Sequence, residues 1–538
     1  MSFELRDRDL MGRIGRLRTK GGEVETPAFM PVVNPVTQTI LPRRMGEEFS
    51  CEIIITNSYI IKKNFGDQPG LRVRDLLDYE GVIATDSGAY QLLVYGEVEI
   101  TPEEIIRYQQ EIGSDIAVIL DIPTGWNESR SRVEYTVDET LRRARSALPL
   151  IQGDETLWVG PVQGGAHLDL VERSAREIGG MPFQIHALGS PTEVMESYNF
   201  HVLVDMIMAA KLNLPSERPL HLFGAGHPMM FSLAVALGCD LFDSAAYAIY
   251  ARDGRYLTPL GTERLEGLSH LPCVCPVCSK HDAEELRGML KGERVRLLTE
   301  HNLHATMAEM KRVKQSIMEG TLWELMEARS RGHPSLVSAM RKLYDYREAL
   351  ERKSPSFKGR GLFFFDSVGL ARPEVTRHIK RLEANFPTAG KEALLLVRAP
   401  GRKPFTSARE YQRLMERLEE ELPDGLGRLQ VCFYAAPFGV VPAELSETYP
   451  LSQFVVPEPL DWETLEFAAE KVASFFEAGG YAEAVLHRGE GDLDILVGLR
   501  CEEVSKKTGK ELKVVSDPAP WGEGTLDRLI SALETSLA

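Results

Sequence analysis

The chain has 538 residues, of which 43% are hydrophobic and 26% charged, a balance typical of a globular protein with more than one domain. It has no uninterrupted apolar stretch of eighteen residues, and its start, MSFELRDRDL, holds no apolar run. The sequence therefore predicts neither a membrane span nor a signal peptide, and it favours the cytoplasm. A net charge of −17 argues against broad charge-driven binding to nucleic acid, although it does not exclude a local basic patch.

Eight short β-rich segments, separated by helical or loop segments, occupy about the first 250 residues. Several are almost continuously apolar, as strands buried on both faces of a parallel sheet should be. Helix signals lie between them, and Thr101-Pro102-Glu103-Glu104 supplies an N-cap, a proline at the first helical position and acids in the first turn. This alternation predicts an α/β fold, a (βα)8 TIM barrel, with an open doubly wound sheet as the alternative. The predicted strands are Ala28–Val33, Cys51–Asn57, Val82–Asp86, Ile116–Asp121, Leu157–Gln163, Gln184–Leu188, Pro219–Gly224 and Cys239–Asp243.

The residues after about 280 change character. Residues 291–350 show helical spacing of apolar positions, and the polar RKSPSFKGRG at 352–361 is typical of a linker. Beyond it, GLFFFDS, EALLLVRAP and LQVCFYAAPFG predict strands, and SAREYQRLMERLEEEL predicts a helix. The last eighty residues combine helices (TLEFAAEKVASFFEA, TLDRLISALETS) with the predicted strands YAEAVLHR and LDILVGL. The expected domains are a catalytic barrel at 1–345 with a zinc-binding subdomain at about 270–305, an α/β domain at 346–460, and a small α+β domain at 461–538.

Three of the seven cysteines crowd together, and a histidine follows 23 residues after the last of them. These residues are Cys273, Cys275, Cys278 and His301. Three thiolates and one imidazole predict one structural zinc ion per chain, without the open position that a catalytic metal needs. His281 and His304 are alternative fourth ligands, and His301 is preferred. The remaining cysteines lie in apolar surroundings and are predicted to be buried rather than disulfide-bonded: Cys51, Cys239, Cys432 and Cys501.

Polar or glycine-rich sequences fall at the C-terminal ends of six predicted strands, the face where barrel enzymes build active sites. Each has a simpler interpretation by itself, because an aspartate can cap a helix and a glycine pair can form a turn. Three carboxylates at one barrel mouth, Asp86, Asp121 and Asp243, are harder to explain by packing. In glycosidic chemistry one carboxylate attacks the anomeric carbon while another protonates the leaving group. The six sequences are Asp86-Ser-Gly-Ala-Tyr-Gln91, Asp121-Ile-Pro-Thr, Gln163-Gly-Gly165, Gly189-Ser190, Gly224-Ala-Gly-His-Pro228 and Asp243-Ser-Ala-Ala-Tyr247.

With the cysteine cluster, the segments DSGAYQ, QGG, HLFGAGHP and CDLFDSAAYAIYARDGRYLTP resemble the tRNA-guanine transglycosylase family over roughly residues 10–330. FDSAAYAIYARDGRYLTP and the long C-terminal extension are similar to the archaeal branch (archaeosine tRNA-ribosyltransferases). Members of that branch exchange guanine at position 15 of the tRNA D-arm for 7-cyano-7-deazaguanine (preQ0), on the route to archaeosine.

The resemblance implies a role for each strand-end residue. Asp243 is the expected nucleophile, which bonds to ribose C1′ as guanine leaves, and Asp86 is the expected general acid/base. Hydrogen bonds to the base edge are expected from Ser87, Asp121 and Gln163, and stacking from Tyr90. Gly189-Ser190 stands where the family pattern has Gly-Gly, and its backbone N–H groups are expected to keep binding the base.

The implied partners are tRNA, preQ0 and a second copy of the chain. Arg252 and Arg255, just past Asp243, are candidates for phosphate contacts, with solvated surface arginines as the alternative. Many archaeal members end in a basic PUA domain that grips tRNA, whereas the last eighty residues here are acidic. Either a separate PUA protein supplies that module, or the α/β extension holds tRNA, with modest candidates at Arg372–Arg381 and Arg398–Lys403. A solvated helix face is the favoured interpretation of Arg372–Arg381.

Three other functions compete with base exchange. An archaeosine synthase-like paralogue would lack the catalytic aspartates and carry a Pro-Cys-x-x-Lys-Pro-Tyr motif, whereas this sequence has both aspartates and lacks the motif. A noncatalytic tRNA-binding subunit of the same family is also disfavoured by the intact aspartates. A barrel metallohydrolase unrelated to RNA is disfavoured because the metal cluster has no open position.

Overall fold

The computed structural model describes residues 2–89, 100–386 and 390–537. The chain divides into two compact units, and the break lies between Leu343 and Tyr344. In the described ranges, no helix is both long enough and apolar enough to cross a membrane.

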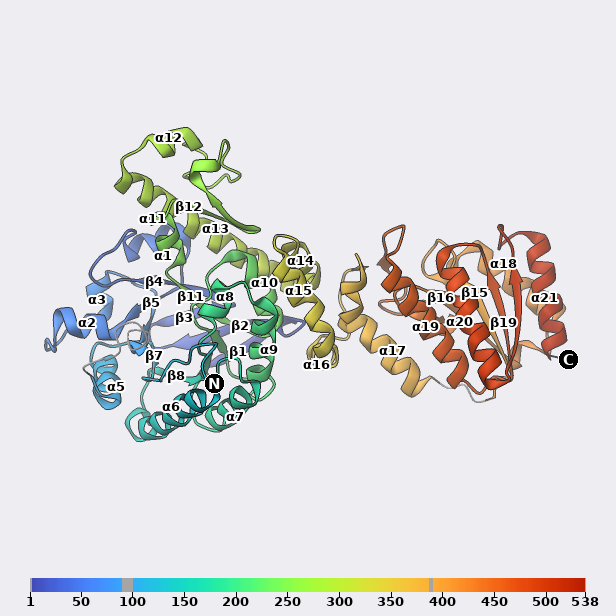
Figure 1. Cartoon of the computed structure of the whole chain (residues 1–538), viewed down its shortest axis with the longest axis horizontal. Helices are drawn as coiled ribbons and strands as arrows, with labels where there is room; N and C mark the ends of the chain where they lie inside the picture. The colour runs from blue at the N-terminus through green and yellow to red at the C-terminus, as the bar shows by residue number, and fades with distance from the viewer. Residues whose placement is uncertain (1, 90–99, 387–389, 538) are drawn as a thin grey trace. The chain divides into compact units, whose positions relative to one another are not determined.

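Eight parallel strands close into a barrel in the first unit, in the order β10-β11-β4-β5-β6-β7-β8-β9 (Figure 1). Pairing of Phe242 with Phe29 joins the last strand to the first and closes the barrel. The predicted TIM barrel is confirmed, and the open sheet is excluded; each predicted strand overlaps an observed one. The strands are β4 (Ala28–Val33), β5 (Ile53–Asn57), β6 (Val82–Asp86), β7 (Ile116–Val118), β8 (Leu157–Val162), β9 (Ile185–Leu188), β10 (Leu220–Leu222) and β11 (Leu241–Ser244).

Helices surround the barrel, and a small antiparallel sheet packs against the beginnings of its strands. In that sheet, Phe3, Leu17 and Val24 join the core formed by inward-facing barrel residues. The sheet consists of β1 (Phe3–Asp9), β2 (Gly12–Thr19) and β3 (Gly22–Thr26). The barrel helices are α1 (Pro42–Phe49), α2 (Ser58–Phe65), α3 (Val73–Leu77), α5 (Pro102–Glu111), α6 (Arg130–Ile151), α7 (Leu168–Gly179), α8 (Thr192–Glu196), α9 (Phe200–Lys211), α10 (Phe231–Ala236) and α11 (Ala246–Arg252). The N-cap expected at Thr101 is present as a capping box with Glu104.

A buried ion pair fastens β2 to the barrel. The Arg13 guanidinium contacts both carboxylate oxygens of Asp240, Nε to Oδ1 at 2.7 Å and Nη2 to Oδ2 at 2.8 Å. Oδ2 also accepts from the Leu220 backbone N–H at 2.8 Å. Burial opposes ionisation of Asp240, but Arg13 and Lys211 hold its pKa below the usual value. The pair therefore ties together the starts of β10 and β11.

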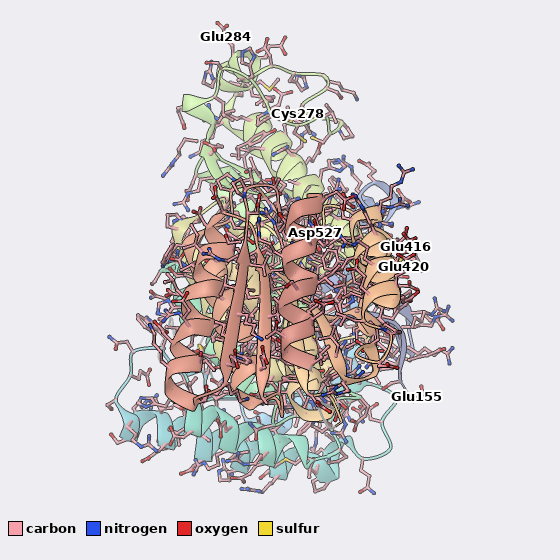
Figure 2. The ribbon with its side chains drawn as sticks, turned by 90° about the vertical axis from the view of Figure 1, so that its right-hand side faces the viewer. Glu155, Cys278, Glu284, Glu416, Glu420 and Asp527 are labelled. Carbon is pink, nitrogen blue, oxygen red and sulfur yellow. The ribbon has the colours of Figure 1, made fainter. Side chains whose placement is uncertain are left out.

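A separate segment of the first unit follows α11 and projects from the barrel at α12 (Figure 1). It contains the hairpin of β12 (Arg255–Thr258) and β13 (Gly261–Arg264), the cysteine loop and α12 (Ala283–Gly288). Cys278 and Glu284 mark this segment in Figure 2. The long α13 (Lys291–Glu319) then returns to the barrel, and α14 (Leu322–Ser330) and α15 (Pro334–Lys342) complete the unit.

The second unit is built on a five-stranded sheet in the order β17-β16-β15-β19-β20, parallel except for β17. Its strands are β15 (Ala393–Arg398), β16 (Leu429–Ala435), β17 (Gly439–Pro442), β19 (Glu483–Arg488) and β20 (Glu511–Ser516). A separate short parallel pair joins β14 (Leu362–Phe363), which precedes β15 in the chain, to β18 (Phe454–Val455), which lies between β17 and β19 in the chain. The domain boundary expected at 460 differs from this arrangement, because β19, from beyond that position, pairs directly with β15.

Two helices cover each face of this sheet. On one face α18 (Arg409–Glu421) and α21 (Glu523–Leu537) share a core with the strands, and on the other α19 (Trp462–Ala478) and α20 (Asp492–Thr508) do so. Glu416, Glu420 and Asp527 are exposed on α18 and α21 (Figure 2). The helices α16 (Arg347–Lys353) and α17 (Pro373–Asn385) precede the sheet.

One secondary-structure expectation for the second unit was wrong. The segment LDILVGL is part of α20 rather than a strand, and its Leu496, Val497 and Cys501 pack against the sheet. Apolar runs of this length do not distinguish a strand from a buried helix. Of the basic residues in Arg372–Arg381, considered for tRNA contact, Arg372 and Arg377 are buried and donate to the backbone carbonyl groups of Phe363 and Pro355, respectively, whereas Lys380 and Arg381 are exposed.

Replacing Arg13 with Met is expected to lower the free energy of unfolding of the first unit by about 3 kcal/mol, because the Asp240 carboxylate stays buried without its nearest cation. Urea unfolding followed by circular dichroism measures this change. Arg18→Met is the matched control on the same strand, where the arginine is half-exposed and pairs with surface acids; its effect should stay below about 1 kcal/mol. Equal effects of the two substitutions would contradict the stabilising role of the buried pair.

Candidate active site

The carboxyl ends of the barrel strands open into a cavity of about 1130 Å³. The structure brings nine of the predicted site residues into its lining: Asp86, Ser87, Asp121, Gln163, Gly189, Ser190, Asp243, Arg252 and Arg255. Tyr90, expected to stack on the base, falls within residues 90–99, outside the described residues. Residues from five different strands therefore meet at one site, as parallel strands in a barrel require.

Asp86 ends β6 and is held by Asn57 at the end of β5, by Ser58 at the start of α2 and by the backbone of Gly88. The Asn57 amide donates to Asp86 Oδ1 at 2.7 Å, and the Gly88 backbone N–H donates to the same oxygen at 2.7 Å. The Ser58 hydroxyl donates to the Asp86 carbonyl at 2.6 Å. Burial, together with the negative charges of Asp243 and Asp121, raises the pKa of Asp86 to about 7, although the Gly88 hydrogen bond lowers it. This carboxyl group can therefore give and take a proton near neutral pH.

Asp243 lies on β11 and receives two hydrogen bonds on one carboxylate oxygen. His221 Nε2, from β10, lies 2.7 Å from Oδ1, and the Gly224 backbone N–H donates to Oδ1 at 3.0 Å. Because a carboxylate can only accept, His221 carries a hydrogen on Nε2. The His221 side chain is 2% exposed and that of Asp243 is 16% exposed. These contacts fix the carboxylate through Oδ1 and do not use Oδ2.

Sequence reasoning missed both partners of the aspartates. Asn57 and Asp86 are register partners at the ends of adjacent strands, and His221 lies on the strand next to that of Asp243. The sequence did contain a signal for each partner, because Asn57 in ITNSY and His221 in HLFGAGHP are polar residues within or at the end of an otherwise apolar strand. Such residues become informative only once the strand neighbours are known.

Asp121 and Gln163 form the opposite wall. Both side chains are buried, and Gln163 Nε2 donates to Asp121 Oδ2 at 2.6 Å. Burial raises the pKa of Asp121 to about 6, against the opposing hydrogen bond from Gln163. The pair offers a hydrogen-bond acceptor beside an amide donor, a pattern that suits the edge of a guanine-like base.

Two other predicted contacts to the base are partly engaged within the protein. The Ser87 hydroxyl donates to the Ile119 carbonyl at 3.2 Å, so it faces the cavity as an acceptor. The Gly189 backbone N–H donates to the Val162 carbonyl at 2.9 Å. This backbone N–H, expected to bind the base, is therefore used between strands.

The two arginines beyond Asp243 lie at the rim of the cavity. Arg252 ends α11 and is exposed, and Arg255 begins β12, with its guanidinium 4.8 Å from the ring centre of Tyr250. Arg255 also lies 3.9 Å from Asp253. Their position suits contact with a phosphate, although an arginine in this setting is also typical of a solvated surface.

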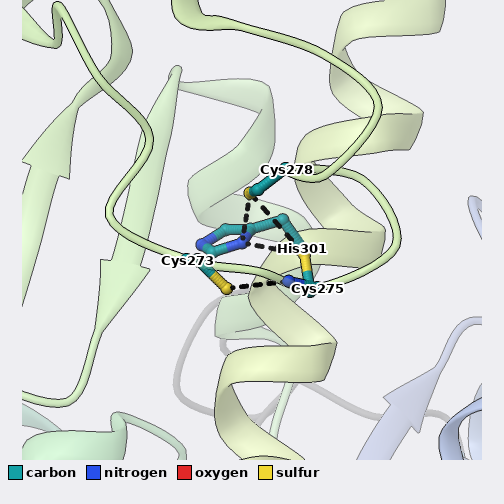
Figure 3. Close-up of side chains that lie close together, drawn as sticks. All are labelled: Cys273, Cys275, Cys278 and His301. Atoms are coloured by element: carbon teal, nitrogen blue, oxygen red, sulfur yellow. Dashed lines mark hydrogen bonds between the residues drawn. The ribbon is translucent and has the colours of Figure 1, made fainter.

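The three clustered cysteines and His301 converge on one point (Figure 3). Cys275 Sγ lies 3.6 Å from Cys278 Sγ, and His301 Nδ1 lies 3.5 Å and 3.3 Å from these two sulfurs. The four donor atoms, including Cys273 Sγ, all lie within 4.8 Å of one another. Tetrahedral zinc with bonds of about 2.3 Å would place two sulfurs about 3.8 Å apart, so the cluster fits such an ion.

The competing histidines lie outside this cluster. His281 Nδ1 is 3.6 Å from Glu285, and the ring of His304 packs 4.3 Å from that of Phe49. His301 is instead held for ligation by Nδ1, because its Nε2 lies 3.0 Å from the Leu257 carbonyl and its ring stacks on Tyr256 at 3.6 Å. Such a partner on the second nitrogen orients a metal-binding histidine.

The helix that carries His301 also supports the segment that follows Asp243. Asn302 accepts from the Leu257 backbone N–H at 2.9 Å and donates to the carbonyls of Tyr247 and Arg255 at 3.1 and 3.0 Å. Tyr247 belongs to α11 and Arg255 to β12. The metal cluster and the active-site wall are therefore joined through adjacent residues of α13.

Comparison with known proteins gives matches for both units. The family model described as queuine tRNA-ribosyltransferase matches residues 8–335, and a domain of unknown function matches residues 375–533. The tRNA-guanine(15) transglycosylase of Methanosarcina acetivorans is 45% identical over 486 residues, 89% of this chain and 93% of that protein. The protein of the same name from Aeropyrum pernix is 44% identical over 479 residues, covering 88% and 91% of the two chains. That from Haloferax volcanii is 43% identical over 480 residues, covering 88% of each.

Cys275→Ser is expected to lose bound metal and to lower the melting temperature, because a tetrahedral site without one thiolate no longer links the loop to α13. The number of metal ions per chain is measured by inductively coupled plasma mass spectrometry, and the melting temperature by calorimetry. His304→Asn, which alters the rival histidine one turn further along the same helix, should keep the metal. A Cys275→Ser chain that retains full metal content and melts like the wild type would rule out the site.

Proposed function

Because the chain belongs to the queuine tRNA-ribosyltransferase family of tRNA-guanine transglycosylases, we propose that it exchanges guanine at position 15 of tRNA for preQ0, on the route to archaeosine. We further propose that exchange passes through a covalent bond between ribose and Asp243. The observation that carries the proposal is the pair of carboxyl groups, Asp86 and Asp243, lining one cavity with the Asp121–Gln163 pair. The family supports transfer at a tRNA ribose, and the names of the relatives support position 15.

Asp243 acts as the nucleophile in this proposal. His221 and Gly224 hold Oδ1, so the carboxylate can present Oδ2 to ribose C1′. The C1′–N9 bond breaks as the C1′–Oδ2 bond forms, and the proton of Asp86 moves to the departing guanine. Asp86, now a carboxylate, takes the proton of the incoming base as that base attacks C1′ and releases Asp243. Two displacements retain the configuration at C1′.

In this proposal, Asp121 and Gln163 on the opposite wall of the cavity recognise the base. Asp121 can accept from the ring N–H and the exocyclic amine, while Gln163 donates to the carbonyl oxygen of the same base. Ser87 would add an acceptor, and Tyr90 would stack on the ring. Guanine, preQ0, preQ1 and queuine all share this edge, so the choice of preQ0 rests on the similarity to the archaeal relatives.

The remaining partners are part of the same proposal. Cys273, Cys275, Cys278 and His301 would hold one zinc ion, which cross-links the loop to α13 and leaves no position for substrate. Arg252 and Arg255 would contact tRNA phosphates at the cavity rim. A homodimer follows from the family, and a separate PUA protein is the proposed source of further tRNA contacts. The archaeosine synthase-like and noncatalytic alternatives are disfavoured because both carboxyl groups stand in the cavity with hydrogen-bonded partners.

Asp243→Asn is expected to lower guanine exchange by at least about a thousandfold, because an amide cannot serve as the nucleophile. The assay follows radiolabelled guanine into transcribed tRNA, with and without unlabelled preQ0. In the wild type, label should enter position 15, and preQ0 should block it. Asp169→Asn, the same change at an exposed residue of α7, is the control. Unchanged turnover in Asp243→Asn would exclude the nucleophile role, and no incorporation by a folded, metal-loaded wild type would point to a missing RNA-binding partner or a later-acting paralogue.

The release of guanine is expected to slow as pH rises above about 7. The raised pKa of Asp86 means that the carboxyl group keeps its proton below about 7 and loses it above that pH. Only the protonated form can donate to the leaving base, so the single-turnover rate should fall up to about tenfold per pH unit on the alkaline side. The measurement is release of labelled guanine from tRNA between about pH 6 and 9. Asp86→Asn should be slow and lack this alkaline decline, and an identical decline in that variant would assign the titration to another group.

A further inference from the structure

Ser190 adopts a backbone conformation that serines rarely use. It follows β9 with φ at +66°, in the left-handed region where glycine fits without strain. Its side chain makes two hydrogen bonds across the cavity wall. The hydroxyl donates to Gln163 Oε1 at 2.9 Å and accepts from the Thr124 backbone N–H at 2.9 Å. The strained backbone therefore places a hydroxyl group that glycine would not supply.

The neighbouring glycine shows how closely the Gln163 amide is held. A Cβ atom at Gly189 would lie 2.2 Å from Gln163 Nε2 and 2.6 Å from Gln163 Cδ. The amide thus rests directly on the Gly189 backbone, and Gln163 is 1% exposed. Gly189 leaves room for the amide plane, and Ser190 bonds to its oxygen.

These contacts determine which way the Gln163 amide faces. The Thr124 backbone N–H, 3.2 Å from Oε1, can only donate, so the amide atom beside it must be the oxygen. The amide nitrogen then faces Asp121 Oδ2 at 2.6 Å. In the reverse orientation, the amide N–H of Gln163 would face the N–H of Thr124, and the amide oxygen would face the carboxylate of Asp121. Since the amide nitrogen carries two hydrogens, the second one remains for a ligand in the cavity that Gln163 lines.

We propose that Ser190 is a specificity-determining positioning residue: its hydroxyl accepts from the Thr124 N–H and adds a donor at Gln163 Oε1, which reinforces the amide orientation that Thr124 and Asp121 set. The amide nitrogen therefore stays toward the cavity, which selects bases that carry a carbonyl oxygen over bases that carry an amino group there. The inference rests on the proposed function, because it takes a guanine-like base as the ligand. Ser190 acts through Gln163 and needs no contact with the base itself.

The left-handed serine alone would not support this role. Ser50 has a similar φ of +58°, yet it is an exposed C-cap at the end of α1, a common place for this conformation. What distinguishes Ser190 is that its hydroxyl joins a buried chain of hydrogen bonds running from Thr124 through Gln163 to Asp121. Ser50 therefore supplies the matched control for the same substitution.

The test compares binding of guanine with that of 2,6-diaminopurine, in which an amino group replaces the carbonyl oxygen. Equilibrium dialysis with the full chain measures both free bases without tRNA, for the wild type, Ser190→Ala, Ser190→Gly and Ser50→Ala. The wild type should prefer guanine at least tenfold, and both Ser190 variants should narrow that preference about tenfold. In exchange assays their KM for guanine should rise by a similar factor, with kcat at saturating base within about twofold. Ser50→Ala should match the wild type in every respect.

The two Ser190 variants separate the hydroxyl from the backbone. Alanine keeps the strained backbone and loses the hydroxyl, whereas glycine loses both and is expected to fold at least as stably. Equal losses of preference support the proposal. A wild-type preference that persists in both variants, or one lost in alanine but kept in glycine, overturns it. A wild-type chain that binds neither base overturns the proposed function as well, so the two failures are distinguishable.

Discussion

Three carboxyl groups line one cavity at the mouth of the barrel, and burial opposes the ionisation of two of them, Asp86 and Asp121. Each carboxyl group has its own hydrogen-bond donors. Asn57 and the Gly88 backbone serve Asp86, Gln163 serves Asp121, and His221 with the Gly224 backbone serves Asp243. Much of the surrounding structure, from strand register to the turn at Ser190, follows from placing these donors.

The different donors give the three groups different chemistry. Burial dominates at Asp86 and leaves a carboxyl group able to transfer a proton near neutral pH, whereas the donors on Asp243 orient the carboxylate proposed as the nucleophile. Support extends beyond the cavity, because Asn302, next to His301 of the cysteine–histidine cluster, holds both α11 and β12. The metal cluster can therefore matter for the active site without touching substrate.

The barrel could be predicted from the sequence because its strands are short apolar runs with polar residues at their ends. The same reasoning failed for α20, whose apolar run is buried as a helix, and for β20, whose residues are mostly half-buried or exposed. The pairing of β15 with β19, across the boundary expected at 460, is a long-range property that a local sequence pattern does not reveal. Asn57 and His221 were missed for the same reason, since their roles depend on which strand lies next to which.

Closure of the barrel has a consequence for biosynthesis. β11 carries the proposed nucleophile and pairs with both β10 and β4. The residues of β4 are synthesised more than two hundred positions before those of β11. Until β11 has left the ribosome, β4 and β10 keep unpaired edges, which are prone to aggregation. The nascent chain therefore cannot assemble the proposed catalytic pair before the barrel closes, and an arrested chain that ends before β11 would lack Asp243 and be a substrate for chaperones.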